Sequence, residues 1–193
     1  MSTWTEGAGT LARRMGVWLS KSLFCAALVA PTSAVLAAEP VIVICELGTS
    51  TRTFSPAATT TPQDIDVTTS SEFSNCLTVL GQPTLKGNVT TGPYERTGLT
   101  CSNPLATGSG EATITWNTGE FSKFDYTSVD VNVAGAATVV TYAGTVLHGK
   151  YYGSTATWTI TYTTALLNLA CTLNPAGVSS LGGIAQLTIT RVL

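Results

Sequence analysis

The chain has 193 residues, of which 44% are hydrophobic and only 10% are charged, and its formal net charge at pH 7 is -2. The charges are scattered rather than gathered into a basic stripe, so nucleic acid is not an expected partner. A chain of this length is expected to form one domain around one hydrophobic core.

The first predicted element is an N-terminal leader for export. Basic residues precede an apolar run at 23–30, which small or modest side chains follow up to Ala37. This order is typical of a signal peptide, which we expect over residues 1–37. The apolar run is too short for a comfortable bilayer span, so no permanent membrane anchor is expected. Residues 38–193 are then predicted to be a single secreted or cell-envelope β domain.

From Val41 onward the sequence predicts strands. Threonines alternate with Ala156, Trp158 and Ile160 between residues 155 and 163. A period of two with β-branched residues on the polar side is typical of a half-buried antiparallel strand. The phase of this pattern places Trp158 in the core, and the phase around Trp116 does the same. The alternation recurs in three further segments: 112–117, 129–133 and 185–189.

Turn residues separate the alternating segments at short intervals. They are found at Asn117-Thr118-Gly119, Gly135, His148-Gly149-Lys150 and Gly182-Gly183, the last of which is expected to precede the final strand. The segment 166–171 is compatible with a strand or with one or two helical turns. Closely spaced hairpin signals favour a meander. We therefore expect an all-β fold: an antiparallel β-sandwich or squat β-barrel of about eight to ten strands with little helix.

Four cysteines remain after the leader, and we expect them to form two disulfides in an oxidising compartment. Four cysteines allow three pairings, and the sequence does not choose among them. We favour Cys76–Cys101, which closes a moderate loop, and Cys45–Cys171, which would fasten both ends of the fold. Zinc or redox sites usually use closely spaced cysteine pairs, which this chain lacks. No metal or cofactor site is expected.

Tyrosines provide the candidate ligand site. An aromatic ring can pack against the apolar face of a sugar, and Tyr151-Tyr152 must present one ring outward if the strand that they begin is regular. Tyr142 is the third candidate for such a platform. A cell-wall or extracellular polysaccharide is the corresponding candidate partner.

No motif in the sequence indicates a catalytic centre. Glu111 and Glu120 flank one predicted hairpin and provide a candidate carboxylate pair for glycoside hydrolysis. Asp64 and Asp66 share one predicted strand face, but calcium usually needs several more oxygen ligands. His148 is the only histidine and lies at a predicted hairpin tip, where an exposed side chain needs no function. A non-enzymatic protein is therefore expected.

Several short motifs carry a resemblance that covers most of residues 38–193. They are Phe54-Ser55-Pro56, Thr59-Thr60-Thr61-Pro62-Gln63, Asn75-Cys76, the segment 108–116, Gly144-Thr145-Val146, Gly153-Ser154-Thr155-Ala156 and Cys171. With these motifs the chain resembles a family of small exported, uncharacterised β-rich proteins of actinobacteria. The resemblance implies an exported β-rich domain with two disulfides, and it carries no catalytic residues across.

These patterns favour a secreted or cell-envelope protein with a non-enzymatic binding or structural role. Three alternatives stay open. They are a carbohydrate-binding module that uses surface tyrosines, a secreted hydrolase with a carboxylate pair, and a pore-forming barrel of the cell envelope. The last is kept because alternation by itself does not separate a soluble sheet from a membrane barrel.

Overall fold

The computed structural model describes residues 41–79, 85–105 and 108–191, so the expected signal peptide lies outside the described residues. The regular structure is almost entirely strand, as predicted. The elements in chain order are β1 (Val41–Ala58), β2 (Gln63–Thr78), β3 (Leu85–Leu99), β4 (Gly110–Trp116), β5 (Phe121–Ala134), β6 (Ala137–Gly149), β7 (Ser154–Thr163), α1 (Thr164–Leu173) and β8 (Val178–Arg191). No helix in this part of the chain is long and apolar enough to cross a membrane.

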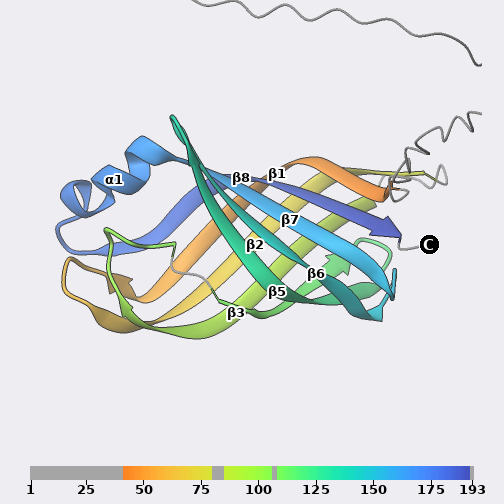
Figure 1. The fold of residues 1–193 in the computed structure, drawn as a ribbon, viewed down its shortest axis with the longest axis horizontal. Coiled ribbons are helices and arrows are strands. Elements are labelled where there is room, and N and C mark those ends of the chain that lie inside the picture. The colour runs from red at the N-terminus through yellow and green to blue at the C-terminus, as the bar shows by residue number, and fades with distance from the viewer. Residues whose placement is uncertain (1–40, 80–84, 106–107, 192–193) are drawn as a thin grey trace, which may run out of the picture. The chain divides into compact units, whose positions relative to one another are not determined.

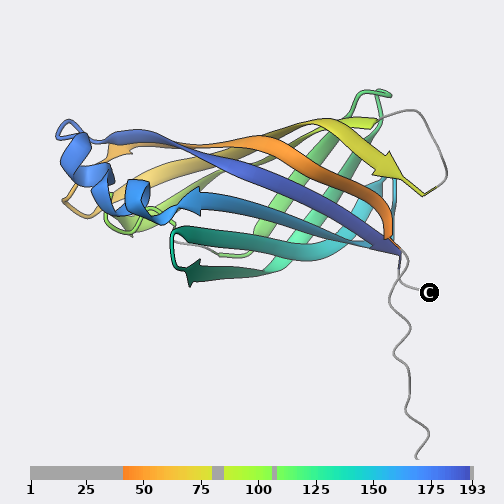
Figure 2. The same ribbon diagram turned by 90° about the horizontal axis from the view of Figure 1, so that it is seen from above.

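The strands form a closed, up-and-down antiparallel barrel. Each strand pairs with its neighbours in the chain, and β8 pairs with β1 to complete the circle (Figure 1). Of the two predicted architectures, the barrel is therefore the observed one. The segment that was ambiguous in the sequence is α1, which links β7 to β8 at one end of the barrel (Figure 2). We call this the α1 end.

Large apolar side chains fill the barrel from alternate positions of every strand. Trp116, Trp158 and Phe124 are fully buried, as predicted for both tryptophans. Each indole N–H has a hydrogen-bond acceptor inside the barrel: Trp116 Nε1 donates to Ser122 Oγ at 2.9 Å, and Trp158 Nε1 donates to Ser71 Oγ at 3.1 Å. These bonds remove the cost of burying an unsatisfied donor.

Threonines occupy the outward positions. Thr159 lies opposite Thr141 on β6, and Thr157 lies opposite Thr188 on β8. Their β-branched side chains suit the pleated surface, and their hydroxyls face water. The polar outer face and the apolar inner face together explain the period of two in the sequence.

The two disulfides fasten opposite ends of the barrel, and the predicted pairing is wrong. Cys45 is joined to Cys76 between the start of β1 and the end of β2, with 4.2 Å between the two Cα atoms. Cys101, in the loop after β3, is joined to Cys171 of α1, with 5.4 Å between the Cα atoms. The predicted Cys45–Cys171 bond fails because the β1–β8 register places these residues at opposite ends. All four predicted cysteines are nevertheless in disulfides.

Two predictions about strand extent also need correction. Gly182 and Gly183 do not precede the last strand, because β8 runs through both. A Cβ on Gly183 would lie 2.9 Å from Ile160 Cγ2, so glycine is needed there for the close approach of β8 to β7. The predicted apolar face at 129–133 is only half-buried at Val129 and becomes exposed farther along β5.

Removing either disulfide should lower the free energy of unfolding. We expect a loss of roughly 4 kcal/mol for Cys101→Ala with Cys171→Ala, and a slightly smaller loss for Cys45→Ala with Cys76→Ala. The order follows from sequence separations of 70 and 31 residues, because the longer loop loses more entropy on closure. Urea unfolding measures both values. Peptide mapping without reductant tests the pairing, and recovery of a linked Cys76–Cys101 peptide would contradict it.

Candidate functional site

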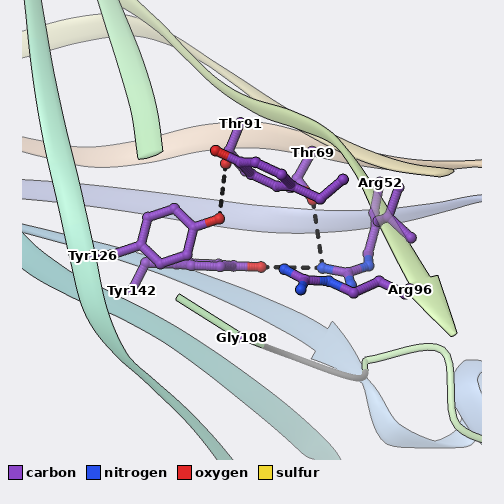
Figure 3. A pocket seen from close by; sticks show the side chains of 9 residues that line it. Arg52, Thr69, Thr91, Arg96, Gly108, Tyr126 and Tyr142 are labelled. Atoms are coloured by element: carbon purple, nitrogen blue, oxygen red, sulfur yellow. Dashed lines mark hydrogen bonds between the residues drawn. The ribbon is translucent and has the colours of Figure 1, made fainter. Parts of the chain in front are cut away.

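A hollow inside the barrel, in the half nearer α1, is lined by arginines, tyrosines and threonines (Figure 3). It has a volume of about 10 Å³, close to the smallest space that holds one water molecule. None of the described side chains that line it is acidic. We call the polar residues of this lining the arginine–tyrosine cluster: Arg52, Thr69, Thr91, Tyr94, Arg96, Tyr126 and Tyr142.

A β-bulge in β1 turns Arg52 into the barrel. Val43 and Cys45 are buried at odd-numbered positions, whereas Ser50 and Arg52 are buried at even-numbered ones. The pairing of β1 with β8 is irregular between Cys45 and Gly48, where this change occurs. An extra residue in one strand reverses which side chains face inward beyond it. Without the irregularity Arg52 would face the solvent.

A second irregularity, in β3, turns Tyr94 and Arg96 toward the same hollow. Thr91 is buried at an odd-numbered position, and the inward side chains after the irregularity are at even-numbered ones. Gly92 lies at the change of phase with a φ of +94°, which residues with a side chain rarely adopt. A Cβ at this position would also collide with the carbonyl oxygen of Val67.

Arg52 is 4% exposed, and neutral groups are among its partners. Its Nη1 donates to the Tyr142 hydroxyl at 3.1 Å and makes a longer contact of 3.5 Å with Thr69 Oγ1. Its guanidinium lies 5.9 Å from the ring centre of Phe54. An arginine side chain has only donor atoms, so the Tyr142 oxygen must be the acceptor of this hydrogen bond. The Tyr142 hydroxyl proton is therefore still available for donation to another group. No described residue accepts that proton.

Aromatic contacts fix the tyrosine that holds Arg52. Tyr142 stacks on Trp158 with 4.8 Å between ring centres and meets Tyr126 edge to face at 5.1 Å. Such pairs fix ring orientation beyond what burial alone provides. The position of the Tyr142 hydroxyl is therefore set by the packing of the barrel core.

The other two tyrosines are oriented by hydrogen bonds to β3 and β4. Tyr126 bonds Thr91 at 2.9 Å, and Thr91 donates to the carbonyl oxygen of Glu111 at 2.6 Å, so Tyr126 is the donor to Thr91. Tyr94 donates to the same carbonyl and accepts the Glu111 N–H. Burial raises the pKa of Tyr126. This hydroxyl therefore stays protonated near neutral pH.

Arg96 is the least constrained cation of the cluster. Its guanidinium lies 5.6 Å from the ring centre of Tyr94, and it makes no hydrogen bond or ion pair with the described part of the chain. The side chain is half-buried, and Figure 3 shows it extending toward Arg52 and Tyr142. Two cations line this small hollow, and none of its described lining side chains is acidic, which favours a positive potential there.

The structure separates the three tyrosines predicted to form a platform. Tyr142 is buried in the barrel, so its assignment to the surface is wrong. Tyr151 is half-buried, its ring 5.6 Å edge-on from Trp116 and 5.5 Å from Lys150 Nζ. Only Tyr152 presents its ring to solvent, at 74% exposure. The β6–β7 turn thus displays one ring rather than a platform.

The carboxylates considered for catalysis are also apart. Glu111 lies near the start of β4 and pairs with Lys123, whereas Glu120 follows the β4–β5 turn and pairs with Lys150. Glu120 lies beside Trp116 at the far end of β4, five residues along the strand from Glu111. This corresponds to roughly 17 Å along the strand. This exceeds the spacing of about 5–9.5 Å that glycosidases use. The hydrogen bond from Lys150 is the main cause of the lowered pKa of Glu120.

The remaining candidates from the sequence have ordinary surroundings. His148 is exposed near the end of β6, as expected. Asp64 accepts the Gly98 N–H at 3.1 Å, and Asp66 is exposed. Within residues 41–79, 85–105 and 108–191, no three His, Cys, Asp or Glu side chains gather in a way that could hold a metal ion.

No protein-family model matches this chain, and no curated protein or solved structure shows significant similarity to it. The resemblance to the actinobacterial family therefore stays a prediction. The arginine–tyrosine cluster is identified from its geometry alone.

Sequence reasoning missed both arginines because each follows an irregularity that changes which side chains of its own strand face inward. A signal for each was nevertheless present. Arg52 stands two residues before Phe54, and Arg96 stands two residues after Tyr94, so each shares a strand face with an aromatic residue. A charged residue in phase with buried aromatics is a candidate for an inward-facing functional group.

Two tyrosine substitutions should affect stability differently. The Tyr162 hydroxyl is buried and has no hydrogen-bond partner in the described structure, and burial raises its pKa well above the usual range. Tyr162→Phe should leave the free energy of unfolding unchanged or raise it by about 1 kcal/mol, because the phenylalanine buries no unpaired polar group. Tyr142→Phe should lower it by roughly 1.5–3 kcal/mol, because it removes one of the acceptors of the buried Arg52 guanidinium. Chemical denaturation compares the two, and equal losses would contradict this account.

The irregularity in β3 can be tested with two glycines of the same strand. Both Gly92 and Gly98 have positive φ, but a Cβ on Gly98 would meet nothing within 4 Å. Gly92→Ala should lower the free energy of unfolding by more than about 1 kcal/mol and by more than Gly98→Ala, because only Gly92→Ala adds a collision to the backbone strain. Thermal or urea unfolding provides the comparison. Equal effects would show that the close approach at Val67 does not matter.

Proposed function

We propose that this protein is an exported, non-enzymatic binding protein that holds the carboxylate group of a ligand in the arginine–tyrosine cluster. The observation that carries the proposal is the half-buried Arg96 guanidinium, which lines a hollow together with Arg52 and has no hydrogen bond or ion pair with the described residues. An arginine presents its N–H donors as a planar fork that matches the two oxygens of a carboxylate.

Electrostatics favour an anion in this hollow. Arg52 and Arg96 line it without an acidic side chain among the described lining residues, and the surrounding rings and strands keep the local dielectric constant low. Like charges in such a place repel each other more strongly than in water. A bound anion would attract both guanidinium groups and offset the repulsion between them. Anion binding would therefore stabilise the cluster.

Hydrogen bonding adds selectivity. Arg96 has N–H donors that bond no described residue, and no described residue accepts the proton of the Tyr142 hydroxyl. A carboxylate oxygen accepts from both kinds of group. Because Trp158 and Tyr126 fix the ring of Tyr142, its donor is in place before the ligand binds. Preorganised donors lower the entropic cost of binding.

The hollow is large enough for one functional group of a ligand but not for a whole ligand molecule. Its volume of about 10 Å³ is far below the roughly 300 Å³ or more of pockets that enclose a drug-sized ligand. A sugar ring does not fit, whereas one end of a carboxylate does. The remainder of the ligand then lies toward the opening of the hollow.

Two observations support an extracytoplasmic location. Both disulfides indicate an oxidising environment, since such bonds are rare in the cytosol. The predicted leader at residues 1–37 points the same way. We propose that the domain acts outside the cytoplasm, either secreted or held at the cell envelope.

The other functions considered from the sequence have less support. A membrane barrel carries an apolar band outside, whereas the outward positions here carry threonines such as Thr157 and Thr159, and the apolar side chains point inward. A carbohydrate-binding surface would depend on Tyr152 alone. The separation of Glu111 from Glu120 disfavours a hydrolytic pair.

Binding of acetate, the simplest carboxylate probe, tests the proposal. Calorimetric titration at constant ionic strength, with chloride as the reference salt, should detect acetate binding to the wild type. Arg96→Gln should weaken the affinity by roughly 10-fold or more, because it removes a charge-assisted hydrogen bond. Arg191→Gln removes an exposed arginine at the end of β8 and should leave the affinity unchanged.

The outcomes separate the possibilities. No acetate binding by the wild type, or equal affinities of wild type and Arg96→Gln, would overturn the proposal. If chloride bound as tightly as acetate, the carboxylate proposal would be overturned and the cluster would be assigned to halide binding. Retention on a polysaccharide that depends on Tyr152 would support the carbohydrate-binding alternative instead.

A further inference from the structure

In the described part of the chain, the C-terminal part of β5 has a paired strand on only one side. β4 pairs with β5 no farther than the Gly110–Tyr126 position, whereas β6 continues alongside β5 to Ala134. Among the described residues, 127–134 therefore form an open edge of the sheet. Half of their backbone N–H and C=O groups point away from β6 and can pair with another strand.

The equivalent edge of β3 is protected, and this contrast is informative. Beyond Thr91, β3 has no β4 partner either. Its sequence there contains Pro93, Glu95, Arg96 and Gly98, which are the residue types that discourage pairing at sheet edges. The β5 segment Thr-Ser-Val-Asp-Val-Asn-Val-Ala has no proline, glycine or basic residue. Only Asp130 gives it a charge.

Apolar side chains on this edge are exposed. Val131 and Val133 are 40% and 63% exposed, although they lie opposite Val140 and Thr138, which are buried. The valines continue the inner face of the barrel past the point where the wall is complete. β-branched residues at alternate positions of an open edge favour the addition of a further strand.

We propose that a second copy of this chain pairs with this edge, antiparallel, about a two-fold axis at Val131. In this register Val129 faces Val133 of the other copy, and Asp130 faces its Asn132. Valine meets valine on one face of the new sheet, and carboxylate meets amide on the other. No like charges lie opposite each other, which would destabilise the pair. The segment is thus complementary to itself, as a two-fold interface requires.

The dimer should be weak and dependent on concentration. One strand pair of this length buries less surface than a standard stable interface needs. Its stabilisation comes from pairing backbone groups along residues 128–134 and from covering Val131 and Val133. The proposal is independent of the arginine–tyrosine cluster, because neither arginine takes part in the contact.

Sedimentation velocity over a range of concentrations tests the association. The wild type should shift from monomer to dimer as its concentration rises. Val131→Lys should remain monomeric, because the register places the two lysines directly opposite each other. Leu47→Lys, which alters an apolar residue on β1 that is even more exposed than Val131, should dimerise as the wild type does. Circular dichroism confirms that both variants are folded.

Cysteine cross-linking tests the register. Val131→Cys should form an intermolecular disulfide under mild oxidation, since directly opposite residues have the Cβ spacing that such a bond needs. Asn132→Cys should not, because it faces Asp130 of the other copy. A wild type that is monomeric at every concentration, or a Val131→Lys variant that still dimerises, would overturn the proposal. Equal cross-linking of Val131→Cys and Asn132→Cys would overturn the proposed strand register. If the edge paired with a different protein instead, a heterodimer would be detected.

Discussion

Closure of the sheet, through the pairing of β8 with β1, is the constraint on which the rest of this structure depends. Once the barrel is closed, every strand has one face inside, and each inward side chain must fill space and satisfy its polar groups. Trp116 and Trp158 meet both demands through their rings and their bonds to serines. The disulfides fasten the two ends of this closed sheet rather than joining one end to the other.

The proposed binding site lies where the regular alternation is interrupted. The irregularities in β1 and β3 each change the phase of a strand and bring Arg52 and Arg96 into the apolar interior. A buried cation is costly unless nearby groups stabilise it. Here a tyrosine hydroxyl and aromatic rings do so, without a carboxylate from the described lining. The barrel therefore holds positive charge in a place where it is suited to meet an anion.

The short β4 links the two proposals physically. Because β4 begins only at Gly110, no described strand lies between the later parts of β3 and β5. On one side of this gap lies Arg96, beside the hollow. On the other lies the unprotected edge of β5. A ligand and a second copy would thus use neighbouring parts of the same incomplete wall, with different chemistry at each.

The sequence by itself determined the strand content, the burial of Trp116 and Trp158, the formation of disulfides by four cysteines and the exposure of His148. Each of these follows from local periodicity, turn chemistry or composition. Only the tertiary structure decided which cysteines pair, that Tyr142 faces inward, and that Arg52 and Arg96 line the same hollow. These depend on strand register and on irregularities that change it by one residue. A period-two pattern records which residues share a face within one regular strand, but not how separate strands are aligned, nor where an extra residue exchanges the two faces.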